Sequence, residues 1–280
     1  MVSLFAGCSD NQLTGNAVDV RKDAEPVSEV SDARIRSLVD RARWGDGQAY
    51  LQLADCFRDG IGVKKDFLGM VCMVGQARDH DAIRNEDVYF SRLPDDNEYK
   101  RLFDLLNIPL YRQREQKDSI LAQLSTMECP DALAFRGVKF VEGGDSVGGF
   151  ETIRKAAEDG SNFAALLLTS PDMKRFDKNK LEQIADKVPF VYTILGGMCL
   201  DPEENGPVDE KQAACYFLKA EKHAMLTKWK ALWLLRYYRN GGEVQLSDED
   251  VKRLESLVRA WDEDDDDEVV VTDTVCTDSI

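Results

Sequence analysis

The segment from Ala49 to His80 has the sequence AYLQLADCFRDGIGVKKDFLGMVCMVGQARDH, a pattern of helix, glycine-containing turn and helix. The same pattern returns without a gap after a shift of 143 residues, from Tyr192 to His223. The two copies are identical at Cys56/Cys199, Asp66/Asp209, Cys72/Cys215, Ala77/Ala220 and His80/His223. Internal repetition of a helical hairpin is typical of a solenoid, in which each unit buries its apolar face against its neighbours.

Apolar residues at helical spacing predict two antiparallel helices in the first copy. One helix carries Ala49, Leu53, Ala54 and Phe57 along a single face, and the other carries Met70, Met73, Val74 and Ala77. Gly60 and Gly62 permit the positive φ angles that turn the chain back between them. Asp66 is placed to cap the second helix.

The order Ala-x3-Leu-Ala-x2-Phe-x2-Gly-x-Gly-Val-x2-Asp in residues 49–66 resembles the Sel-one-like repeat, a relative of the tetratricopeptide repeat. The later copy resembles that repeat in its second helix, through Asp209, Ala213, Tyr216, Phe217, Lys219 and Ala220. A third copy runs from Ala132 to Gly160, and fainter units occupy residues 161–188 and 228–258. The resemblance implies an all-α solenoid of antiparallel helix pairs.

Composition and pattern divide the chain into three parts. Residues 1–30 form a leader and polar tether, residues 31–260 the repeat solenoid, and residues 261–280 an acidic, disordered tail. Residues 83–127 do not fit the repeat, and either a diverged repeat or an insertion accounts for them. Within this segment we expect two helices, near residues 97–106 and 113–124, separated by Ile108-Pro109.

The charge balance excludes one class of partner. The chain has 36 Lys and Arg against 52 Asp and Glu, a net charge of −16. Seven of the negative charges form the run from Asp262 to Glu268, where mutual repulsion resists folding. Because acidic surfaces repel phosphate groups, we expect no nucleic-acid partner. No stretch approaches the roughly 20 apolar residues that a membrane-spanning helix needs.

The N-terminal sequence Ala6-Gly7-Cys8 resembles a bacterial lipobox, which implies cleavage before Cys8 and attachment of lipid to its thiol. The polar residues 9–29 resemble the tether that follows such an anchor. We therefore expect a protein at the cell envelope that touches the membrane only through this lipid. The alternative is an ordinary N-terminus with an isolated cysteine, and a cytoplasmic location.

Four cysteines lie on either side of the repeat turns, because Cys56 and Cys72, and likewise Cys199 and Cys215, are separated by 16 residues. Each pair either bridges its own hairpin, which requires Cα atoms within about 7 Å and an oxidising compartment, or fills small buried positions. His80 and His223 occupy equivalent repeat positions near the ends of second helices. The helix dipole there favours a partly protonated imidazole, and we expect a structural role for both.

No known catalytic pattern accompanies the repeats. The glycine-rich segment 142–149 lacks the Lys-Ser/Thr of a phosphate loop and follows a helix, so we predict a flexible hairpin turn that is shorter than the turn of the first copy. We expect no catalytic residues, no metal and no cofactor. Trp229, Trp233 and Tyr237 stand at helical spacing and are the candidates for a binding surface, because exposed aromatic residues often mark one.

The resemblance implies a non-enzymatic scaffold that binds a protein or peptide on the concave face of the solenoid. We expect a monomer. One alternative is a cell-wall-related hydrolase, implied by activities attributed to cysteine-rich members of the family. A cytoplasmic adaptor and a structural role through self-association of the end repeats are the others.

Overall fold

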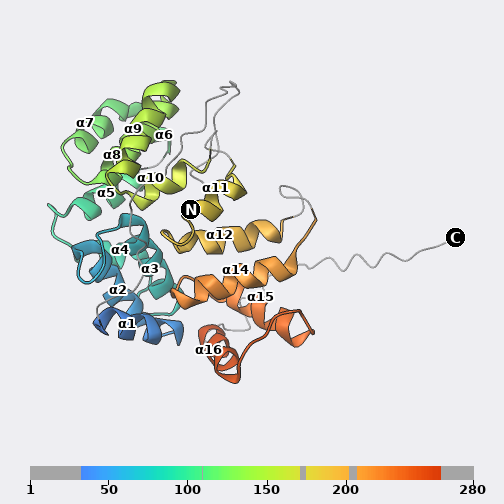
Figure 1. The fold of residues 1–280 in the computed structure, drawn as a ribbon. Helices are drawn as coiled ribbons and strands as arrows, with labels where there is room; N and C mark the ends of the chain where they lie inside the picture. Colours follow the sequence, from blue (N-terminus) through green and yellow to red (C-terminus); the bar gives the residue numbers. More distant parts are fainter. Residues whose placement is uncertain (1–32, 109, 171–174, 202–206, 260–280) are drawn as a thin grey trace.

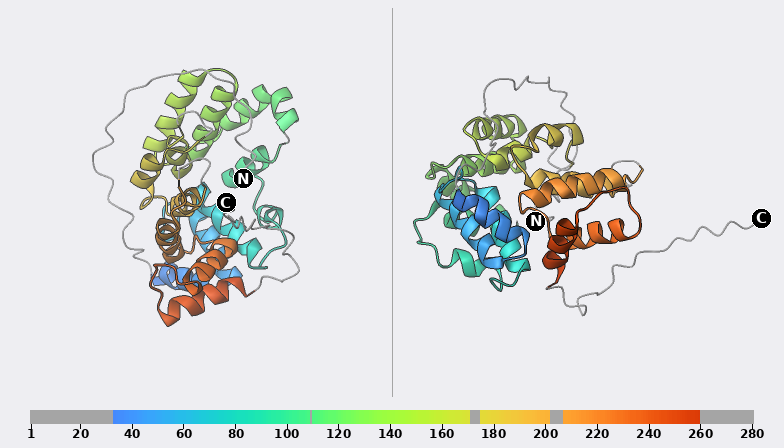
Figure 2. Two further views of the ribbon diagram at one scale, coloured as in Figure 1. Left: turned by 90° about the vertical axis from the view of Figure 1, so that its right-hand side faces the viewer. Right: turned by 60° about the horizontal axis from the view of Figure 1, so that its bottom comes forward.

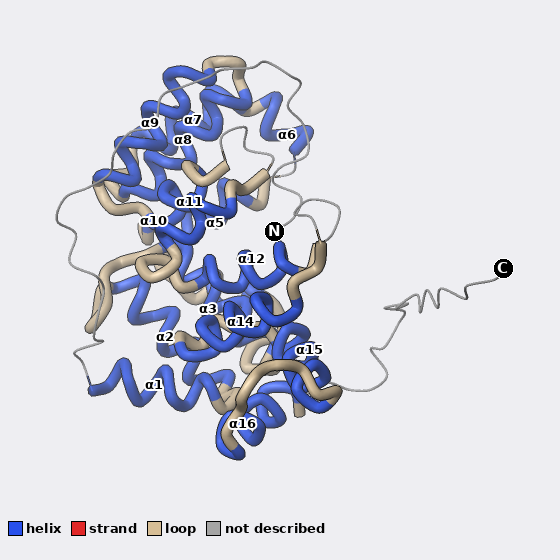
Figure 3. The backbone as a smooth tube through the Cα atoms, turned by 45° about the vertical axis from the view of Figure 1, so that its right-hand side comes forward, coloured by secondary structure: helices blue, strands red, loops and turns tan. Residues whose placement is uncertain are grey.

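The structure is a computed structural model that describes residues 33–108, 110–170, 175–201 and 207–259, and all regular elements in these ranges are helices (Figures 1 and 3). Cys8, the tether and the acidic tail lie outside the described residues. Three hairpins pair α2 (Gly47–Asp59) with α3 (Phe67–Asp79), α8 (Pro130–Glu142) with α9 (Ser146–Glu158), and α12 (Phe190–Cys199) with α14 (Glu210–Lys222). These hairpins are the three predicted copies, so the predicted all-α array of helix pairs is confirmed.

The remaining helices extend the array at both ends and in its middle. α1 (Ala33–Arg43) packs on α2, and α15 (Lys228–Arg239) pairs with α16 (Asp248–Val258) as a further unit at residues 228–258. The shorter helices α10 (Asn162–Leu167) and α11 (Lys178–Ile184) occupy the faint unit between α9 and α12. No described helix has the length and apolar character needed to cross a membrane.

The segment that does not fit the repeat consists of short helices. They are α4 (Glu86–Phe90), α5 (Glu98–Leu106), α6 (Leu110–Glu115) and α7 (Lys117–Ser125). α5 lies where a helix was expected, but the second expected helix is divided at Gln116 and α4 was not predicted. Because α4 packs on α3 and α7 packs on α8, the segment bridges the first and third copies.

The second helix of each copy ends in the same way. Just beyond each helix, a backbone N–H donates a hydrogen bond to the carbonyl five residues earlier, in the pairs Ala82–Ala77 at 2.9 Å, Ser161–Ala156 at 2.9 Å and Met225–Ala220 at 3.0 Å. The residue before each donor has a positive φ, which is 57° at Asp81, 97° at Gly160 and 56° at Ala224. This shared ending confirms the alignment of the three copies.

The predicted turn and cap of the first copy are also confirmed. Gly60 and Gly62 have φ angles of 73° and 71°. The Asp66 carboxylate accepts a hydrogen bond of 3.1 Å from the Leu68 N–H at the start of α3. The aligned Asp209 accepts one of 2.9 Å from the Gln212 N–H at the start of α14. Both second helices therefore begin at an aspartate cap.

The turn within the glycine-rich segment is residues 143–145, shorter than the 60–66 turn of the first copy, so the expected shortened turn is confirmed. Gly148 and Gly149 lie inside α9. A Cβ atom on Gly149 would lie 2.8 Å from the carbonyl oxygen of Gly137 in α8, and a Cβ on Gly137 would lie 2.8 Å from that of Gly149. Because Gly137 and Gly149 have no side chain, α8 and α9 can lie close together.

The array curls back so that its first and last units touch, and Figures 1 and 2 show α1 near α14 and α16. Arg43 of α1 forms a salt bridge of 2.9 Å with Glu221 of α14. The Ser256 hydroxyl of α16 donates a hydrogen bond of 2.8 Å to the backbone oxygen of Trp44. One continuous apolar core contains Ile35 of α1 as well as Leu254 of α16. The described helices therefore form one closed body.

Replacing Gly149 by Ala tests the close contact between α8 and α9. We expect the free energy of unfolding to fall by about 1–3 kcal/mol, because the new methyl group meets backbone atoms that cannot move aside. Gly75→Ala in α3 is the matched control, since a Cβ there meets nothing within 4 Å. That change should raise the free energy of unfolding by about 0.5–1 kcal/mol through helix propensity. Urea unfolding followed by circular dichroism measures both, and effects of the same sign would contradict the assignment.

Candidate functional site

A groove of about 510 Å³ lies where α14 begins and α15 ends. Aromatic rings, charged side chains and a glycine turn line it, and they include Glu210, Lys211, Trp233, Arg236, Tyr237 and Gly242. Its size falls within the range of about 300–1,000 Å³ that ligand sites usually have. The groove is thus large enough for a small molecule or part of a peptide.

Two stacked rings form one wall of the groove. The rings of Trp233 and Tyr237 are nearly parallel, with an angle of 7° and 5.3 Å between centroids. Trp233 also meets the buried ring of Phe217 edge-on at 5.4 Å, which connects the wall to the core of the protein. Both groove rings are half-buried. The wall therefore presents a flat aromatic surface whose position is set by packing.

The turn after α15 holds Tyr237 from the other side. The backbone N–H of Glu243 donates a hydrogen bond of 3.2 Å to the Tyr237 hydroxyl, and that of Gly242 donates one of 2.9 Å to the Tyr237 carbonyl. A Cβ on Gly242 would lie 2.5 Å from the Tyr237 ring. Only glycine lets the turn lie this close, and Gly241 before it has a φ of 83°.

Charges of both signs surround the aromatic wall. Lys211 and Glu243 form an ion pair of 2.6 Å, with side chains 63% and 73% exposed. Glu210 and Arg236 are exposed at the same opening. The groove can therefore contact an apolar side chain while offering hydrogen-bond donors and acceptors to polar groups beside it.

The predicted aromatic residues divide into two sets. Trp233 and Tyr237 line the groove, whereas Trp229 lies on the same helix, 43% exposed and outside the lining. Spacing alone placed all three on one face. The hollow depends on the turn that covers Tyr237, and only the glycine pair 241–242 signalled that turn in the sequence.

The predicted cysteine pairs lie in the hairpins as expected. Cys56 and Cys199 are buried, Cys72 is half-buried and Cys215 is exposed. Burial raises the pKa of the Cys72 thiol, and it raises that of Cys199 despite the Lys178 ammonium 3.7 Å from its sulfur. Raised pKa values make these thiols poor nucleophiles. Bridging of the pairs in an oxidising compartment stays a prediction.

The two histidines differ from expectation in their charge. Burial, with a smaller effect of the Lys228 charge, lowers the pKa of His80 to about 4, and its ring stacks on Tyr50 at 5.2 Å. Burial also lowers the pKa of His223. Burial therefore disfavours the charged form of both imidazoles, which is opposite to the partial protonation expected at a helix end.

A second hollow, of about 530 Å³, lies between the first and third copies beside Asp131. This residue of α8 is 3% exposed and accepts a hydrogen bond of 2.6 Å from the Ser161 hydroxyl. Burial raises the pKa of Asp131 to about 6, the Ser161 hydrogen bond opposes this, and the neighbouring Asp66 adds to it. Asp131 could not be identified from the sequence, because an acidic residue in the first turn of a helix is usually exposed.

Within the described ranges, no three His, Cys, Asp or Glu side chains are grouped so that they could hold a metal ion. The groove itself contains neither cysteine nor histidine among the residues that line it. Its side chains supply contact surface and hydrogen bonds.

Comparisons with protein-family models and with curated proteins found no match. Among solved structures, the chain is similar to a protective antigen present in uropathogenic Escherichia coli strains displaying an SLR fold, with 18% identity and a TM-score of 0.36 over 81% of this chain. The chain spans 49% of that protein's length. It is also similar to a Sel1 repeat protein from Oxalobacter formigenes, with 17% identity and a TM-score of 0.39, covering 90% of this chain and 95% of that one. This likeness concerns the fold alone.

Asp131→Asn tests the buried carboxyl group. Because the pKa of Asp131 is raised on folding to about 6, its stabilising contribution is complete below about pH 4 and is lost as the pH rises through 6. Between pH 4.5 and 8 the variant should therefore gain about 2–3 kcal/mol of unfolding free energy relative to the wild type, measured by urea unfolding. The exposed Asp96→Asn beside the same hollow is the control and should show no such trend. A gain that does not change with pH would contradict the assignment.

Proposed function

We propose that this chain is a non-enzymatic interaction scaffold that holds a peptide segment of a partner protein in the groove of α14 and α15. The observation that carries this proposal is the preformed aromatic wall. Tyr237 is held on one side by the Trp233 stack and on the other by the Gly242 turn. A wall that is already ordered loses little conformational entropy when a partner binds.

The groove suggests the chemistry of the bound segment. Trp and Tyr are the residues that most often dominate the free energy of protein interfaces. The charged rim contains Glu210, Lys211 and Arg236, so it complements charges of both signs. The segment that fits has one large apolar or aromatic side chain with polar or charged residues on either side.

Hydrolase activity has less support from the same residues. A pair of carboxyl groups that breaks a glycosidic bond needs one acid with a raised pKa. Glu243 is instead hydrogen-bonded to Lys211, which lowers its pKa. The rim carboxylate is therefore ionised at neutral pH, as suits recognition of a cationic or amide group.

Selection from a displayed library of random twelve-residue peptides tests the groove. Peptides enriched on the wild-type protein should lose at least about 10-fold in affinity with Trp233→Ala, because a central aromatic anchor contributes about 2 kcal/mol or more. Trp229→Ala on the same helix is the matched control and should change affinity by less than about 2-fold. Trp233→Phe, which keeps a ring against Phe217, guards against loss of folding and should give an intermediate affinity. Equal binding by wild type and Trp233→Ala would contradict the proposal.

We further propose a location at the bacterial cell envelope through a lipid on Cys8. This residue lies outside the described part of the chain, and the support is the sequence Ala6-Gly7-Cys8 followed by the polar residues 9–29. Protein isolated from its native host should have an intact mass corresponding to a chain that begins at Cys8 with acyl chains attached. An unmodified Met1 chain would overturn this proposal and leave the cytoplasmic adaptor.

A further inference from the structure

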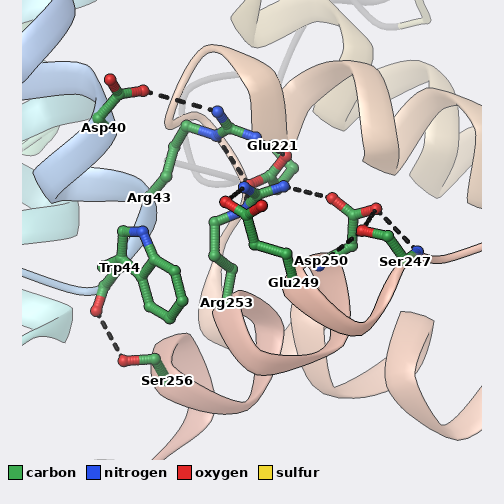
Figure 4. Close-up of polar contacts among 9 residues, drawn as sticks. All are labelled: Asp40, Arg43, Trp44, Glu221, Ser247, Glu249, Asp250, Arg253 and Ser256. Atoms are coloured by element: carbon green, nitrogen blue, oxygen red, sulfur yellow. Dashed lines mark hydrogen bonds and ion pairs between the residues drawn. The ribbon is translucent and has the colours of Figure 1, made fainter.

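The ends of the array meet at one buried carboxylate of α14 (Figure 4). Glu221 of α14 is 4% exposed. Its two oxygens accept hydrogen bonds of 2.9 Å each from Nε and Nη2 of Arg43 in α1. Arg253 of α16 places its Nε 3.3 Å from the same carboxylate. Three helices thus meet at a single side chain, and we call Arg43, Glu221 and Arg253 the clasp.

Among the three copies, only the one that contains α14 has an acidic residue at this position. The aligned residue of the first copy is Arg78, an exposed side chain that pairs with Asp79 and Glu86 at the surface. The aligned residue of the third copy is Ala157. A buried acid at this position is therefore not required by the repeat itself. Its role lies in the contact between the ends of the array.

Each arginine of the clasp has a second acidic partner on its own helix. Arg43 lies 3.7 Å from Asp40 in α1, and Arg253 binds Glu249 at 3.0 Å and also Asp250 in α16. Breaking a buried ion pair is most costly when a charge stays behind without a counter-charge. If α1 moved away from α14, both arginines would keep a carboxylate and Glu221 would gain water.

Polar groups of the first hairpin are also left unsatisfied near the clasp. The Tyr50 hydroxyl and the His80 Nε2 atom are buried without a hydrogen-bond partner in the protein. The two rings stack at 5.2 Å, and a Cβ on Gly45, two residues after Arg43, would lie 3.4 Å from the Nδ1 atom of His80. Burial and, next to it, the charge of Glu221 raise the pKa of Tyr50. An unsatisfied buried polar group costs about 1–3 kcal/mol, a cost that contact with water removes.

We propose that the clasp is releasable, so that α1 separates from α14 and α16 while the helical hairpins stay folded. The closed state gains a bidentate ion pair and the Ser256–Trp44 hydrogen bond, whereas the open state leaves no arginine without an acid and hydrates two unsatisfied polar groups. This balance places the clasp among the first contacts of the molecule to open. The proposal does not depend on what the groove binds.

Hydrogen exchange of the full-length protein, followed by mass spectrometry, tests the proposal. In the wild type, amides of α1 should exchange at least about 10-fold faster than those of α8 and α9, because they open locally. Glu221→Gln keeps the shape of the side chain and should accelerate exchange in α1 by a further 10-fold or so, with α8 and α9 unchanged. Glu255→Gln is the control, since it removes an exposed pair between Glu255 of α16 and Arg239 of α15 and should change exchange in α1 by less than about 2-fold.

Arg43→Gln distinguishes release of α1 from general loss of stability. It should accelerate exchange in α1 but leave α16 protected, because Arg253 still pairs with Glu221. If Glu221→Gln fails to fold, this variant still tests whether α1 is released. Exchange of α1 at the rate of α8 and α9 in the wild type would overturn the proposal. Equal acceleration of α1, α8 and α9 in Arg43→Gln would overturn it as well.

Discussion

The ion pair between Arg43 and Glu221 joins residues 178 positions apart and links the two ends of the array. A stack of helix pairs normally has two free ends, and each end exposes an apolar face that a polar cap must cover. In this protein the first and last units cover each other, because Ile35 of α1 and Leu254 of α16 belong to one core. The array is closed by its own ends.

The closed shape places two different features on the same helices. α14 runs from Lys211 in the groove to Glu221 in the clasp, and α15 runs the opposite way, from Lys228 to Tyr237. Aromatic packing and a glycine turn hold the Trp233 and Tyr237 rings of the groove in place. The clasp is held by arginine side chains that also pair with acidic residues on their own helices. One end of this helix pair is therefore suited to binding, and the other is suited to movement.

Features that depend on residues close together in the chain were predictable from the sequence. Gly60 turns the first hairpin and Asp66 caps its second helix, because both properties depend on a few neighbouring backbone groups. The clasp was not predictable, since Glu221 differs from a surface glutamate only through its contact with α1. The burial of Asp131 was not predictable either, because it depends on contacts with residues that are distant in the chain, such as Ser161. For the groove, spacing identified Trp233 and Tyr237 but also Trp229, because a helical period does not show which residues a distant turn covers.

A double-mutant cycle between Arg43→Gln and Glu221→Gln tests the closure of the array most directly. The free energy of unfolding is measured for the wild type, both single variants and the double variant. If the ends are joined as described, the two changes are not additive, and the coupling free energy is about 1–3 kcal/mol. Additive effects, with a coupling below about 0.3 kcal/mol, would show that the first and last units do not meet in solution.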